Sequence, residues 1–176
     1  MANTFELIAS STVGAGGAAS IDFTSIPSTF TDICVYVSGR STASFTRRVL
    51  RLRINNSSTG SDYADRYLLG NGASASSGSN PAGSSSYIQI WDLPAATGTA
   101  NTFSNISIYI PNYASTSTYK SVSVDGVEEE NGTTAIMGLV AGIYNSNTAI
   151  TQVNLIPDSG NFAEFSTAYL YGVKNA

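Results

Sequence analysis

The sequence contains no histidine and only one cysteine, Cys34. Without histidine, serine triads, Cys–His pairs and the common imidazole-bearing metal sites are excluded. One cysteine cannot form a disulfide within the chain, and a structural zinc site lacks its four ligands. Cys34 lies in the apolar run DICVYV, which indicates a small buried thiol. We therefore expect no cofactor and no metal, although the loop aspartates of SDYAD leave a calcium site open.

Charged residues are scarce as well. They make up 11% of the 176 residues, with 8 Lys+Arg against 12 Asp+Glu and a net charge of -4. A nucleic-acid binder needs an excess of cations to displace the counterions of phosphates, so we expect no nucleic-acid partner. Burying a charged side chain at an interface requires desolvation. A charge-poor surface therefore suits a protein that contacts other chains.

Long hydrophobic runs are also absent. The most apolar segment, TTAIMGLVAGIY, is shorter than the roughly 20 residues that span a bilayer. The start, MANTFELIASS, lacks the basic and continuously apolar regions of a cleaved export signal. We expect no membrane partner and no export signal.

Short segments that alternate apolar and polar residues fill most of the chain, with turn residues between them. In TDICVYVSGR, for example, Ile33, Val35 and Val37 share one face. The ten such segments are FELIASSTV, AASIDFTSI, TDICVYVSGR, VLRLRI, SYIQIW, SNISIYI, YKSVSVDGV, TAIMGLVAGIY, AITQVNLI and STAYLYGV. No window has a helical period with start and stop signals. The sequence thus predicts an all-β protein with little or no helix, an antiparallel β-sandwich of jelly-roll type in one domain, 1–176.

Two segments stand apart from this pattern. Residues 70–86, GNGASASSGSNPAGSSS, are poor in apolar side chains and are predicted to form an exposed loop. Residues 1–18 are candidates for an extended N-terminal arm that, like the loop, orders on a neighbouring chain.

Half of the cations lie in RRVLRLRINN, residues 47–56. As a strand this segment directs Leu50, Leu52 and Ile54 to the core and leaves Arg47, Arg51 and Arg53 on the outer face. One alternative is a solvated face with acidic partners in the same chain. The other, which we favour, is a contact between subunits. The acidic run Glu128, Glu129 and Glu130 is a candidate partner in either case.

Tyrosines near turns are further candidates for contact with sugars or proteins. They include Tyr63 and Tyr113, with the single Trp91 as a possible stacking surface. Ordinary anchoring of loops is an equal alternative. Carboxylates that could form a glycosidase pair lie mostly in turns, and no motif brings two of them together, so we do not expect an enzyme.

Several stretches resemble small virion proteins of tailed bacteriophages. LRLRINNSSTGSDYADRYLLGNG follows the pattern L-R-x-x-F-N-G-x-x-G-x-x-Y, strand, G-N-G, with INN in place of FNG, so Asn56 must supply the tight turn. NTFSNISIYIPNYASTSTYKSVSVDGV and GNFAEFSTAYLYGVKNA extend the resemblance over most of the chain. It implies a jelly-roll capsid cement (decoration) protein that forms homotrimers and binds the major capsid protein on the capsid surface, after assembly in the host cytoplasm. A head- or tail-fibre domain that recognises host-surface glycan is the alternative.

Overall fold

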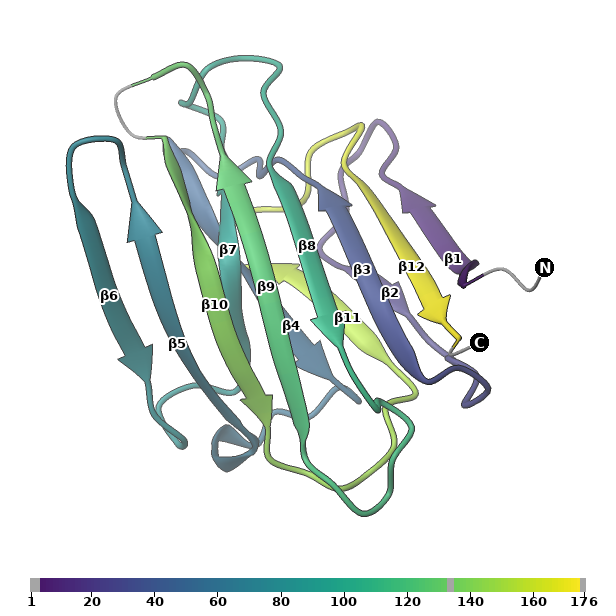
Figure 1. Cartoon of the computed structure of the whole chain (residues 1–176). Coiled ribbons are helices and arrows are strands. Elements are labelled where there is room, and N and C mark those ends of the chain that lie inside the picture. Colours follow the sequence, from purple (N-terminus) through teal and green to yellow (C-terminus); the bar gives the residue numbers. More distant parts are fainter. Residues whose placement is uncertain (1–3, 133–134, 175–176) are drawn as a thin grey trace.

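The chain folds into two antiparallel β-sheets packed face to face (Figure 1). The computed structural model describes residues 4–132 and 135–174. Its strands are β1 (Phe5–Thr12), β2 (Ile21–Phe23), β3 (Asp32–Ser38), β4 (Arg47–Ile54), β5 (Tyr63–Gly70), β6 (Ala75–Asn80), β7 (Ile88–Pro94), β8 (Asn105–Ile110), β9 (Lys120–Glu128), β10 (Ile136–Tyr144), β11 (Val153–Pro157) and β12 (Thr167–Val173). A short 3-10 turn, η1 (Gly60–Asp62), precedes β5. The predicted all-β antiparallel sandwich is confirmed.

The two sheets differ in size. The large sheet has the order β1-β12-β3-β8-β9-β10-β5-β6, and the small sheet has the order β2-β11-β4-β7. In Figure 1 the large sheet lies in front, with β6 at its left edge and β1 at its right edge. The four strands β1-β12-β3-β8 of the large sheet and the four strands of the small sheet have the order that two interleaved Greek keys generate. The hairpins β5–β6 and β9–β10 extend the large sheet beyond β8.

The core lies between the sheets and follows the predicted alternation. Leu50, Leu52 and Ile54 of β4 are fully buried, and so are Ile33 and Val35 of β3. These side chains lie inside because successive residues of a strand point to opposite faces.

Trp91 of β7 packs against two glycines of the large sheet. Gly126 of β9 and Gly138 of β10 are directly paired in the ladder. A Cβ atom on either glycine would lie 2.3 Å from an atom of the indole ring. The bulky ring therefore fits between the sheets only because both positions lack a side chain.

The predicted loop at 70–86 is only partly a loop. Residues Ala75–Asn80 form β6, which pairs with β5 over its whole length. The side chains are exposed as predicted, but backbone hydrogen bonds to β5 make the segment a strand. Asp65 of β5 fixes the hairpin, because its carboxylate accepts hydrogen bonds from Asn80 Nδ2 (2.8 Å) and from the backbone N–H of Gln89 in β7 (3.2 Å).

The predicted N-terminal arm also needs correction. Residues Phe5–Thr12 form β1, which pairs with β12 at the edge of the large sheet. Ala18 is held as well, by a bridge to Phe162. These backbone contacts hold the segment on its own fold, whereas residues 1–3 lie outside the described part of the chain.

Candidate interaction surface

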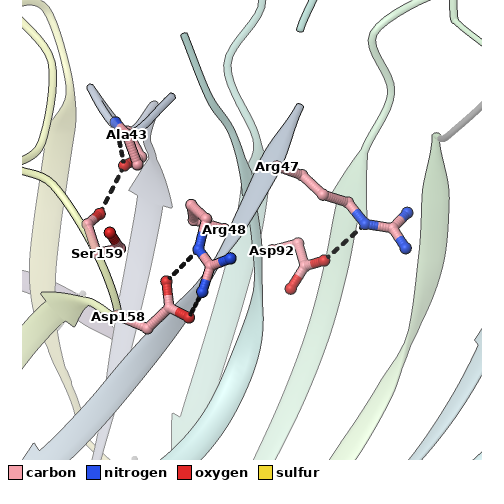
Figure 2. A network of polar contacts seen from close by, with 7 residues as sticks. Ala43, Arg47, Arg48, Asp92, Asp158 and Ser159 are labelled. Atoms are coloured by element: carbon pink, nitrogen blue, oxygen red, sulfur yellow. Dashed lines mark hydrogen bonds and ion pairs between the residues drawn. The ribbon is translucent and has the colours of Figure 1, made fainter. Parts of the chain in front are cut away.

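The arginines of β4 make contacts within the chain. Arg47 forms an ion pair with Asp92 (Nε–Oδ2 3.0 Å), and Arg48 binds Asp158 through Nε–Oδ1 at 2.8 Å (Figure 2). The other two arginines reach the segment before β7. The guanidinium of Arg51 lies 4.4 Å from the centre of the Tyr87 ring, and Arg53 Nε donates to Ser86 O (3.2 Å). These contacts favour the within-chain alternative for the arginine row.

The acidic run is not a solvated turn as a whole. Glu128 is the last residue of β9 and is fully buried, Glu130 is also buried, and only Glu129 is exposed. Among the described residues neither oxygen of the Glu128 carboxyl has a hydrogen-bond partner. Burial, followed by the repulsion of Glu130, raises the pKa of Glu128 to about 7, while Arg47 acts in the opposite direction. Arg47 and the acidic run are thus electrostatic neighbours inside one chain.

The predicted contact residues Tyr63 and Tyr113 are buried, which contradicts their assignment to an interface. Each has 0% of its surface exposed. Tyr63 Oη accepts a hydrogen bond from Ile54 N (3.1 Å) and donates to Ser57 O (3.1 Å), and burial raises its pKa to about 12. Tyr113 Oη donates to Pro27 O. Both residues anchor loops to the core, which was the alternative interpretation.

The tight turn that was predicted at Asn56 is present in the structure. Asn55 and Asn56, which follow β4, have φ angles of 52° and 53°. Asparagine tolerates this left-handed region better than most residues other than glycine. The INN turn therefore has the backbone that the missing glycine of the FNG pattern would favour.

The most unusual surface is the outer face of the large sheet, which no other element of the described residues covers. On β10 and β5 it exposes a group of aliphatic side chains, here called the aliphatic patch: Leu68 (60% exposed), Met137 (63%), Leu139 (54%) and Ile143 (37%). Leu68 and Leu139 are direct partners in the ladder between these strands. Large apolar groups that are exposed together mark contact sites more often than single exposed ones do.

A second group lies at the other end of the same face. This aromatic patch consists of Phe5, Leu7, Tyr36, Tyr109, Tyr169 and Tyr171, from β1, β3, β8 and β12. Tyr36 and Tyr171 meet edge to face, with ring centres 5.9 Å apart. With Phe5 and Tyr169 they line a shallow hollow of about 390 Å³. Rings that are half exposed and carry hydroxyl groups can stack on a ligand and hydrogen-bond to it.

Few charges interrupt this face. Between the patches β9 presents Ser121, Ser123 and Asp125. On the four strands β9, β10, β5 and β6, the exposed charged side chains are Asp125 and Arg66. A partner that covers this part of the face therefore desolvates few charges.

Sequence reasoning missed this surface, although a signal was present. The segment TAIMGLVAGIY is apolar at nearly every position, whereas a sheet with one solvated face has polar residues at every second position. The segment was counted among the alternating strands, and no role was assigned to Met137, Leu139 or Ile143. An apolar strand in an antiparallel sheet indicates that both faces are in contact with something.

The fold and this face together define an all-β sandwich with an uncovered, charge-poor sheet surface. In residues 4–132 and 135–174, no three acidic or cysteine side chains are grouped so that they could hold a metal ion. The same residues include no helix with the length and apolar character needed to cross a bilayer. A scan against protein-family models, a search of curated proteins and a search of solved structures each found no match.

Proposed function

We propose that the chain is a noncatalytic structural protein of a phage virion, a capsid cement protein that forms homotrimers and joins major capsid subunits. The observation that carries this proposal is the outer face of the large sheet, with its aliphatic and aromatic patches and few charges. Covering apolar surface is favourable by roughly 25 cal/mol per Å². The assignment to phage particles rests on the resemblance of the strand and turn motifs.

The mechanism is thermodynamic. A chain that buries surface on two capsid subunits at once stabilises the joint between them, because binding favours the assembled state. The two patches lie at opposite ends of one face, so they can contact different neighbours. Trimerisation adds multivalency, which strengthens weak individual contacts.

The number of copies in purified virions tests the role in the particle. A cement protein occurs in hundreds of copies per particle, and quantitative gel densitometry against the major capsid protein measures this number. Absence of the chain from virions contradicts the whole proposal, and a few copies contradict the cement role.

The capsid contact is tested with shells that lack the chain. Leu139→Ser should lower binding to such shells, whereas Glu164→Gln, in an exposed turn outside the face, should not. If both variants bind the shells equally well, the aliphatic patch is not part of the capsid contact.

A second candidate function is recognition of host-surface carbohydrate by a fibre domain. Trp91, Tyr63 and Tyr113 are buried and cannot take part. The aromatic patch and its hollow of about 390 Å³ favour this candidate instead.

A glycan array separates the two functions. In the carbohydrate case Tyr36→Ala and Tyr169→Ala abolish binding, and Phe165→Ala, which changes an exposed aromatic residue in a turn, leaves it unchanged. An array on which the wild-type chain binds nothing refutes this candidate.

A further inference from the structure

The aliphatic patch combines its apolar centre with two opposite charges. In the ladders of β10, Arg66 of β5 is opposite Ala141, and Asp125 of β9 is opposite Leu139. The two charged residues thus lie on either side of β10 and two residues apart along it. Strand spacing and residue rise place them about 12 Å from each other. The described residues include no ion pair between them.

This arrangement is complementary to itself. Consider two copies whose large sheets face each other and are related by a two-fold axis that lies between the sheets. If this axis is perpendicular to the line from Arg66 to Asp125 and passes over its midpoint, each Arg66 lies opposite the Asp125 of the other copy. The same rotation brings Leu68 close to the Leu139 of the other copy. One patch then forms two ion pairs around a shared apolar centre, as an isologous interface requires.

The surroundings of the patch accept a second chain. A recess of about 550 Å³ beside Leu68 and Leu139 is bordered by Ser77, Gly78 and Ser123. These three residues are small and uncharged, while Arg66 and Tyr67 also border the recess, so its floor leaves room for an apolar side chain of the other copy. The area of four strands of this length is roughly 500 Å², which is small for an interface and indicates weak association.

We propose that a second copy of this chain docks on the aliphatic patch in a two-fold arrangement, with reciprocal Arg66–Asp125 ion pairs across the contact. The contact covers the same aliphatic patch that is proposed above for the capsid, so each patch binds either the capsid or a second copy, and the two contacts exclude each other. The two-fold contact depends on neither the capsid nor the glycan proposal, because the purified chain alone is sufficient to test it.

Sedimentation velocity over a range of protein concentrations measures the contact. For the wild type, the mass of the smallest species should double as concentration rises. Arg66→Asp alone and Asp125→Arg alone each place like charges opposite each other twice, and should weaken the association about tenfold. The double variant Arg66→Asp/Asp125→Arg restores opposite charges and should return the affinity to within about threefold of the wild type.

Glu164→Arg serves as the matched control, because it reverses an exposed charge outside the face and should leave association unchanged. Leu139→Gln tests the apolar centre and should weaken association without any change in charge. A wild type that keeps one mass at all concentrations overturns the proposal. Single reversals without effect, or a double variant as weak as the single ones, also overturn it. Exposed strand positions tolerate these changes, and circular dichroism verifies the fold of each variant.

Discussion

Replacing Glu128 by glutamine tests the electrostatics of the buried acidic residue. The carboxyl is fully buried without a hydrogen-bond partner among the described residues, and its pKa rises from 4.5 to about 7. Between these values the folded chain holds a proton that the unfolded chain has lost, so the free energy of unfolding falls as the pH rises from 4.5 to 7. One pKa unit corresponds to about 1.4 kcal/mol, so ionised Glu128 destabilises the fold by about 3 kcal/mol above pH 7.

Glu128→Gln keeps the shape of the protonated side chain and cannot ionise. We expect the variant to be more stable than the wild type by about 3 kcal/mol at pH 8 and equally stable at pH 4. For a chain of this length the gain at pH 8 corresponds to a rise in Tm of roughly 10 °C. Thermal unfolding followed by circular dichroism at both pH values measures the difference.

The neighbouring Glu129 provides the matched control, because it has the same side chain in an exposed position. Glu129→Gln should leave stability nearly unchanged at both pH values. The reasoning is refuted if Glu128→Gln is no more stable than the wild type at pH 8, or if its gain is the same at pH 4.

The remaining predictions concern the packing and hydrogen bonds of the core. Gly138→Ala would bring a Cβ atom to 2.3 Å from the Trp91 ring and 2.1 Å from a backbone oxygen, and should cost about 3 kcal/mol or more in urea unfolding. Gly16→Ala, whose Cβ atom would have nothing within 4 Å, is the control, and equal losses would contradict the packing argument. Tyr63→Phe leaves the buried N–H of Ile54 without its acceptor and should cost about 1–2 kcal/mol; an unchanged urea midpoint would show that this hydrogen bond contributes nothing.

The sequence predicted those parts of the fold in which side-chain alternation is strong. The row Leu50, Leu52 and Ile54 lies in the core, and the opposite row of arginines lies outside it, as the period of two requires. The hairpin β5–β6 was missed because Ser76, Ser77 and Gly78 carry no apolar signal. Its backbone hydrogen bonds hold that segment, and they leave no trace in composition.

The candidate site was less predictable, because proximity to a turn does not tell which way a side chain points. Tyr63 begins a strand and points inward, so its place after a turn suggested exposure wrongly. Glu128 was treated as one of three acidic residues available to the arginines, although the inward positions of β9 continue in steps of two from Val122 and Val124 to Glu128. Extending the period to the end of the strand would have found this buried carboxyl.

The position of β12 has a consequence for biosynthesis. This strand, Thr167–Val173, is inserted between β1 and β3, so the first strand of the sheet has no permanent neighbour until the chain has been synthesised as far as Val173. Pairings between distant segments form slowly. The nascent chain therefore leaves Phe5 to Thr12 unpaired on the ribosome, where chaperones or neighbouring nascent chains can reach that strand first.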